Sequence, residues 1–216
     1  FPGGEISVNG GVHLLAIFDP STTTSHIDSL LGAVEFIGTK GKSDDVTQKS
    51  FVEVVDAVSR FGGIAIPAHV DCGSGLFTAF KGTTLIQALK HNAILAMEVV
   101  DPSWEKPKIY HDMEVRWTEV IGSDAHYPAD TEGQSYPGSR FTWVKMGTPN
   151  LEGLRLALLD GTLSVRRCDA ESGNPNKHAD LVIEGIEVTQ ARYMGRAEPF
   201  KLDLSPWLNA IIGGPG

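Results

Sequence analysis

Two runs of strand-forming residues open the chain and predict a β-hairpin. They span residues 4–8 and 12–18, and the intervening Asn9-Gly10-Gly11 is typical of a short glycine-containing turn. If Val8 pairs with Val12, the rest of the register follows, because successive side chains of a strand point to opposite faces.

This register places Glu5 and His13 on the same face of the hairpin. The two residues then lie diagonally across the ladder, close enough to bind one metal cluster. One face is predicted to carry Glu5, Ser7, His13 and Leu15, and the other Ile6, Val8, Val12 and Leu14.

Helical spacing of apolar residues follows the hairpin. A first helix is predicted from Ser25, with Asp28 as a capping partner in its first turn. A second is predicted from about Asp45 to Arg60, ended by Gly62-Gly63. Their apolar positions are Ile27, Leu30, Leu31, Val34 and Ile37 in the first helix, and Phe51, Val54, Val55 and Val58 in the second.

Strands and helices then alternate. Buried strands are predicted at 64–66, 96–100 and near Val120, with a helix at about 84–91 and another that starts at Asn150. The last helix directs Leu151, Leu154 and Leu158 inward and ends at Gly161. This alternation favours an α/β fold with a mostly parallel sheet, open or closed as a barrel, whose ligands gather at the carboxyl ends of the strands.

A change of composition predicts a boundary. We expect a first domain over 1–168, a polar, turn-rich linker over 169–180 and a second unit over 181–216. In the second unit, strands are predicted at 181–189 and 200–204, and a third apolar run spans 208–212.

Composition limits the partners of the chain. The 216 residues carry a net charge of -9, which argues against a large basic nucleic-acid surface. Two cysteines, Cys72 and Cys168, are too few for a disulfide framework, and no apolar run reaches membrane-spanning length. A cytoplasmic protein is therefore expected. The chain begins at Phe1 without a signal-peptide pattern, and we interpret it as a fragment.

The sequence Gly122-Ser123-Asp124-Ala125-His126 follows the apolar Val120-Ile121, where a strand is expected to end. His69 likewise follows the strand that ends at Pro67. With Glu5 and His13, the chain offers two carboxylates and three imidazoles that are expected to converge, and such ligands bind divalent metals. The alternatives are a solvent-exposed carboxylate at Glu5, a core histidine at His13 and a capping residue at Asp124.

The order of these motifs resembles the PHP (polymerase and histidinol phosphatase) superfamily. The motifs are Pro2-Gly3-Gly4-Glu5, Val12-His13-Leu14, Pro67-Ala68-His69 and Gly122-Ser123-Asp124-Ala125-His126. The segment 140–146 (Arg-Phe-Thr-Trp-Val-Lys-Met) and the helix at 151–161 resemble, more narrowly, the PHP module of TrlF-type proteins, which precedes an SMC-like ATPase domain.

The resemblance implies a distorted (β/α)7 barrel that holds two or three divalent metal ions (Mn, Zn or Fe) and hydrolyses phosphoesters. Glu5 would bridge the metals. His13, His69, Asp124 and His126 would be direct ligands, and Glu5, Asp124 and His126 would be catalytic. The His-x-His pair that opens the family pattern does not occur in this sequence, so the first strands and several ligands would lie upstream of Phe1.

The C-terminal segment resembles the entry to an ATPase phosphate-binding loop. The apolar Ala210-Ile211-Ile212 precedes Gly213, Gly214 and Gly216, as in a P-loop that is cut off before its lysine. The complete loop would bind ATP and Mg. A flexible glycine-rich tail is the alternative.

These inferences predict a phosphoesterase that uses a metal-bridging hydroxide. The ATPase resemblance favours a nuclease acting on DNA or RNA and coupled to the downstream ATPase domain. Arg140 and Lys145 would add phosphate contacts, unless they are ordinary surface charges. The other possibilities are a phosphatase for nucleotides or sugar phosphates and a non-catalytic scaffold or sensor for the ATPase.

Overall fold

The structure is a computed structural model that describes residues 1–42, 45–128, 135–171, 173–175, 183–205 and 209–210. The chain divides into two compact units, Phe1–Gly173 and Asn174–Gly216, and each is described by itself. The division falls between residues 173 and 174, within the segment 169–180 that the composition singles out.

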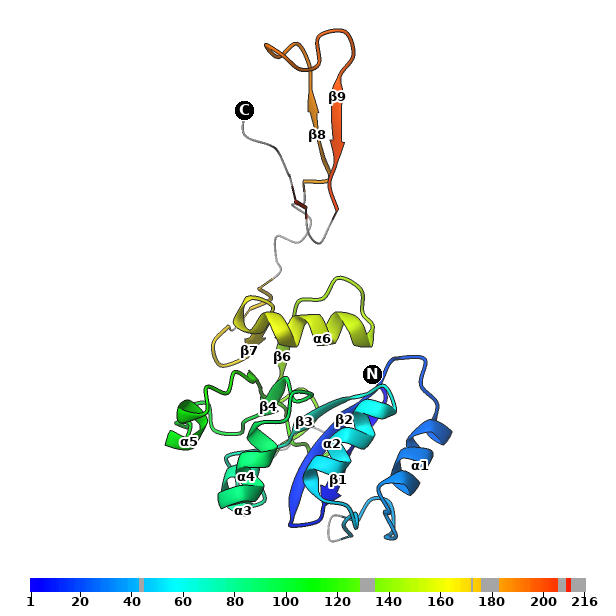
Figure 1. Cartoon of the computed structure of the whole chain (residues 1–216), viewed down its shortest axis with the longest axis vertical. Helices are drawn as coiled ribbons and strands as arrows, with labels where there is room; N and C mark the ends of the chain where they lie inside the picture. Colours follow the sequence, from blue (N-terminus) through cyan, green and yellow to red (C-terminus); the bar gives the residue numbers. More distant parts are fainter. Residues whose placement is uncertain (43–44, 129–134, 172, 176–182, 206–208, 211–216) are drawn as a thin grey trace. The chain divides into compact units, whose positions relative to one another are not determined.

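The first unit begins with a three-stranded antiparallel sheet (Figure 1). Its strands are β1 (Gly3–Val8), β2 (Val12–Ile17) and β3 (Ile64–Pro67), in the order β1-β2-β3. Val8 pairs with Val12 and Ser7 with His13, which confirms the predicted hairpin register. The predicted apolar face is also confirmed, since all four of its residues are buried: Ile6, Val8, Val12 and Leu14.

Helix α1 (Thr24–Ala33) forms close to its predicted start and ends earlier than predicted. Glu35 adopts a positive φ of 55° just after the helix, so the helical spacing stops before Ile37, which is 81% exposed instead of buried. Asp28 was expected to cap the first turn, and that prediction is wrong. It lies one turn further along and forms an ion pair with Lys40.

Helix α2 (Phe51–Arg60) starts later than the predicted Asp45. The backbone N–H of Thr47 donates to the carbonyl of Ser7 (2.9 Å), and Thr47 also forms an isolated antiparallel β-bridge with Phe36. These contacts hold the segment against β1 in a non-helical conformation. The helix begins instead at a capping box formed by Ser50 and Glu53. The predicted inward positions are confirmed: Phe51, Val54, Val55 and Val58 are buried.

The capping box provides a stability prediction. Ser50 accepts a hydrogen bond from the Glu53 backbone, and the Glu53 carboxylate accepts one from the Ser50 backbone. We expect Ser50→Ala to lower the free energy of unfolding by about 1 kcal/mol, because backbone donors of the first turn lose their partner. Urea denaturation measures the loss. Ser59→Ala at the exposed end of the same helix is the control, and equal effects of the two substitutions would contradict the prediction.

The remaining strands pair in small sheets. Strands β4 (Ala96–Glu98) and β5 (Thr118–Val120) are parallel, whereas β6 (Thr142–Val144) and β7 (Val165–Arg167) are antiparallel. Within the described residues, only β4 and β5 pair in parallel, so the predicted mostly parallel sheet is wrong there. The described strands form no closed barrel, and the barrel implied by the resemblance stays a prediction. The helical segments are α3 (Leu76–Ala79), α4 (Gly82–Leu89), α5 (Lys108–Asp112), α6 (Leu151–Asp160) and the 3-10 helix η1 (Gly161–Leu163).

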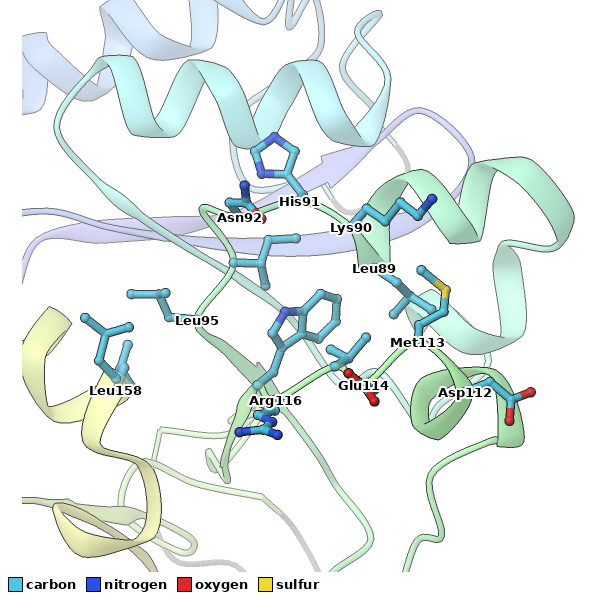
Figure 2. Close-up of a pocket in the computed structure, with 14 residues that line it drawn as sticks. Leu89, Lys90, His91, Asn92, Leu95, Asp112, Met113, Glu114, Arg116 and Leu158 are labelled. Carbon is cyan, nitrogen blue, oxygen red and sulfur yellow. The ribbon is translucent and has the colours of Figure 1, made fainter.

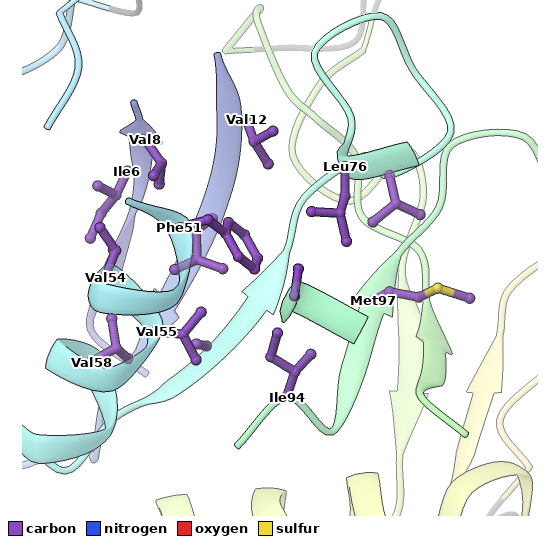
Figure 3. Close-up of a cluster of buried hydrophobic side chains, with 14 of the residues drawn as sticks. Ile6, Val8, Val12, Phe51, Val54, Val55, Val58, Leu76, Ile94 and Met97 are labelled. Atoms are coloured by element: carbon purple, nitrogen blue, oxygen red, sulfur yellow. The ribbon is translucent and has the colours of Figure 1, made fainter. Parts of the chain in front are cut away.

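Apolar clusters cover both faces of the first sheet. On one face, Val54, Val55 and Val58 of α2 pack toward Ile6 and Val8 (Figure 3). On the other face, residues of β3, β4, β7 and α6 form a second cluster. It consists of Ile64, Ile66, Ala96, Leu154, Ala157, Leu158 and Val165. The helix α6 is capped by Asn150 and followed by Gly161 at positive φ, as predicted.

The second unit contains an antiparallel hairpin of β8 (Gly185–Val188) and β9 (Phe200–Asp203). Both strands lie within the predicted ranges 181–189 and 200–204. The glycines of the predicted P-loop, Gly213, Gly214 and Gly216, lie outside the described residues. The longest helices of the described chain have ten residues, and none has the length and apolar character needed to cross a membrane.

Candidate metal centre

Three predicted ligands meet at one point in the first unit. His13 Nδ1 lies 2.5 Å from Glu5 Oε1, and His69 Nε2 lies 3.5 Å from the same oxygen. The two imidazole nitrogens are 3.1 Å apart. One ligand atom from each residue therefore lies within 4.8 Å of the others, which is the spacing of a shared metal ion.

The sheet positions these ligands. Glu5 pairs with Leu15, so Glu5 and His13 lie diagonally across the β1–β2 ladder, as the register predicts. The third ligand arrives because β3 runs antiparallel beside β2. Pro67 pairs with Leu14, and the N–H of Ala68 donates to the carbonyl of His13 (3.0 Å).

His69 itself has a positive φ of 29°, and Cys72 N–H donates to its carbonyl (2.9 Å). This turn holds the His69 side chain against the sheet, and the residue is only 6% exposed. A non-glycine residue keeps a positive φ only where its surroundings hold it, and such positions gather at functional sites.

The cluster couples a carboxylate to an imidazole. Hydrogen bonding with His69 lowers the pKa of the Glu5 carboxyl below its ordinary value, and the same bond raises the pKa of His69. A metal ion requires a neutral imidazole, so its binding would release the proton that Glu5 favours on His69.

Glu98 supports the turn that carries His69, although the sequence reasoning missed it. Its carboxylate accepts the backbone N–H of His69 (3.2 Å), and burial raises its pKa. The nearby charges of Glu5 and Asp124 raise this pKa further. One sequence feature could have indicated Glu98: it is the single acidic residue in the otherwise apolar run 96–100, at the end of a strand.

Gly122 makes room for this carboxylate. A Cβ atom at position 122 would lie 2.3 Å from Glu98 Oε1, which is closer than real Cβ contacts. The glycine of the Gly-Ser-Asp-Ala-His motif therefore has a steric role: it lets the buried Glu98 side chain reach the His69 turn.

Asp124 and His126 both lie outside the group of three residues whose ligand atoms are close enough to share one metal ion. The charge of Asp124 contributes to raising the pKa values of His69 and Glu98, and its φ is 45°. His126 Nε2 lies 3.5 Å from Asp124 Oδ1, but the His126 side chain is 76% exposed. Among the described residues, the group close enough to share one metal ion therefore contains three of the five predicted ligands, namely Glu5, His13 and His69.

The two predicted phosphate-binding cations lie in different surroundings. Arg140 donates to the carbonyls of Val100 (2.9 Å) and Ser123 (3.4 Å), and so joins the end of β4 to the loop that carries Asp124. Lys145 is exposed just after β6, and its backbone N–H donates to Ser164. Within the described part of the chain, no hydrogen bond or ion pair joins the Lys145 side chain to the cluster.

A cavity of about 300 Å³ adjoins Glu5 and His13. Lys40 and Lys42 line it beside these ligands. Neither lysine was singled out from the sequence, although the segment Gly38-Thr39-Lys40-Gly41-Lys42 combines glycines with two cations. A separate cavity of about 650 Å³, lined by residues such as His91, Glu114 and Arg116, contains none of the predicted ligands (Figure 2).

The donor set suits a divalent transition metal. A carboxylate oxygen and two imidazole nitrogens are preferred ligands of Zn, Mn and Fe ions. Two imidazole nitrogens that face each other at 3.1 Å need a proton or a cation between them, because both lone pairs otherwise repel.

Comparison of the chain with protein-family models, curated proteins and solved structures gave no match. The resemblance to PHP proteins therefore depends on the order of the motifs.

Proposed function

We propose that this protein is a metal-dependent phosphoesterase whose metal centre is formed by Glu5, His13 and His69. The observation that supports the proposal is the convergence of these three donors, which come from three different strands or strand ends. Asp124 would complete the centre from the loop after β5. Bound divalent ions would supply a water activated for attack on phosphorus and would neutralise the phosphate oxygens.

The chain itself would bind and orient an anionic substrate. Lys42 lines the cavity beside Glu5 and His13, so it can offset phosphate charge that the acidic protein would otherwise repel, whereas Lys40, which also lines the cavity, is paired with Asp28. Arg140 would keep the Asp124 loop in place through its contact with the Ser123 carbonyl. The bound metal would be Mn, Zn or Fe, and the metal analysis described below distinguishes them.

We take a nucleic-acid phosphodiester as the substrate, because the motifs resemble PHP modules that are linked to SMC-like ATPases. The coupling to a downstream ATPase that binds ATP and Mg is part of the same proposal. A small cavity beside the cluster favours, as the second candidate, a phosphatase for nucleotides or sugar phosphates. The exposed His126 favours the third, a metal-binding module without catalysis.

A parallel assay tests the proposal. The 216-residue chain is incubated with Mn, Zn or Fe ions, and its metal content is measured by mass spectrometry. Hydrolysis of single-stranded DNA, RNA and a nucleoside monophosphate is then followed side by side. We expect metal-dependent phosphodiester cleavage that a chelator stops. His126→Ala should abolish cleavage, and His111→Ala, which removes an exposed histidine outside the cluster, should not.

The outcomes separate the candidates. Preference for the monoester would support the phosphatase, and bound metal without any hydrolysis would support the non-catalytic module. Undiminished metal content and cleavage in His126→Ala would show that His126 is not part of the site. Absence of bound metal in the unsubstituted chain would contradict the metal centre itself.

A further inference from the structure

A second concave site lies away from the candidate metal centre. It is a cavity of about 470 Å³ formed around β5, η1 and β7. This volume is within the range of small-molecule sites. None of the five predicted metal ligands lines it. The lining residues used below are Lys106, Arg116, Trp117, Thr162, Arg166 and Arg167.

Two of the cations in this cavity share one carboxylate. Glu119 forms ion pairs with both Lys106 and Arg167. Arg167 also donates to Asp169 (2.8 Å) and to the carbonyl of Pro102 (3.1 Å), so its guanidinium is held by protein partners. These residues form a fixed frame, and the guanidinium of Arg167 is largely committed to it.

Arg116 and Arg166 are different, because both are exposed and line the cavity without such a frame. Within the described residues, neither guanidinium has an ion pair or a hydrogen bond, and neither does the hydroxyl of Thr162. Arg116 also lines the neighbouring cavity of about 650 Å³, and Figure 2 shows its side chain among the residues of that cavity. In the described part of the chain, these donors are therefore available to a ligand.

The charges of this site are unusual for the chain. Four cations (Lys106, Arg116, Arg166 and Arg167) face two carboxylates (Glu119 and Asp169), which leaves two positive charges in excess. The whole chain has a net charge of -9, so this excess is local. A dianion would neutralise it.

The cavity also has an apolar part. Trp117 and Val165 line it and are buried, and Ala170 adds a further apolar group. An apolar floor beside cationic donors suits a ligand that has both an organic and an anionic part.

We propose that this cavity binds a small organic phosphate monoester. A phosphate monoester carries a charge of about -1.5 to -2 at neutral pH, which matches the two excess positive charges, whereas a monocarboxylate carries only one. The planar guanidinium groups of Arg116 and Arg166 can each bind phosphate oxygens through paired hydrogen bonds. The organic part of the ligand would contact Trp117 and Val165. The proposal does not depend on the metal centre.

Isothermal titration calorimetry with AMP tests this proposal. EDTA is present throughout, so that metal-bound phosphate does not contribute. Adenosine, inorganic phosphate and a single-stranded DNA oligonucleotide are titrated in parallel. We expect saturable binding of AMP, weaker binding of inorganic phosphate and none of adenosine.

Variants locate the binding. The Arg116→Glu/Arg166→Glu double variant is expected to weaken AMP binding at least about tenfold, because each guanidinium makes charge-assisted hydrogen bonds. The Arg60→Glu/Arg192→Glu variant carries the same change in net charge at exposed arginines outside the cavity and should bind normally. The Arg116→Gln/Arg166→Gln variant keeps the side chains long and polar, so it tests the site if charge reversal disturbs folding.

Four results would overturn the proposal. They are the absence of saturable AMP binding, unchanged binding in both Arg116/Arg166 double variants, equal weakening in the control, and binding only of the oligonucleotide. The last result would indicate an extended polyanion surface. Because EDTA is present, none of these results bears on the metal centre, and failure of the metal assay would leave this test unaffected.

Discussion

Glu5→Gln is expected to reduce the metal affinity of the protein by more than about 100-fold. Loss of groups that only support a ligand already costs 10–100-fold, and Glu5 is itself a candidate ligand. Its Oε1 atom lies 2.5 Å from His13 Nδ1 and 3.5 Å from His69 Nε2, so it is the oxygen that both imidazoles face. The amide keeps the size of the side chain and removes its charge. Competition titration with a metal indicator measures the affinity, and phosphoester hydrolysis should decline with the metal content.

Folding should not account for this loss. The Glu5 side chain is 39% exposed, and partly exposed ion pairs contribute less than about 1 kcal/mol to stability. Thermal unfolding of the metal-free protein is therefore expected to change little. Glu105→Gln removes the same charge at an exposed glutamate outside the cluster and should keep full metal affinity. Metal binding by Glu5→Gln equal to that of this control would remove Glu5 from the centre.

Gly122→Ala is expected to destabilise the first unit by about 1–3 kcal/mol, the usual cost of an added methyl group in a filled site. The new Cβ would lie 2.3 Å from Glu98 Oε1. Glu98 is 8% exposed and cannot move into solvent without losing the His69 N–H that it accepts. The melting temperature should fall by roughly 2–12 °C for a protein of this size. Metal affinity should fall as well, because the His69 turn loses its support.

Two further variants show whether the clash with Glu98 is the cause. Gly73→Ala adds a methyl group four positions after His69, where no atom lies within 4 Å, and should have little effect. Glu98→Asp shortens the carboxylate by one methylene. In the Gly122→Ala background it should therefore cost less than in the unsubstituted protein, and a double-mutant cycle measures the difference. Additive effects in that cycle would refute the steric explanation.

Local rules were enough to predict the hairpin that carries two of the ligands. The turn Asn9-Gly10-Gly11 and the pairing of Val8 with Val12 determine which residues share a face, because the side-chain period of a strand is two. Glu5 and His13 could therefore be placed together before any tertiary contact was known.

Other features depended on contacts between distant segments. The late start of α2 follows from the hydrogen bond between Thr47 and Ser7, and no local propensity indicates that bond. Antiparallel pairing of β2 with β3 also escaped prediction, because alternating strands and helices usually indicate parallel sheets. Glu98 was missed for a similar reason. Its role depends on a hydrogen bond from His69 and on the space left by Gly122, and these residues lie 29 and 24 positions away in the sequence.

The sequence by itself determined the residue types of the candidate site, the face that Glu5 and His13 share, and the strand end at which His69 lies. These properties depend on side-chain periodicity and on turn residues, both of which act over a few positions. The tertiary structure decided which of the predicted ligands meet. It placed His69 against Glu5 and His13, added Glu98, left His126 exposed, and gathered Arg116 and Arg166 in a second cavity. Convergence of this kind depends on strand pairing and packing between segments far apart in the chain, and no short-range pattern records it.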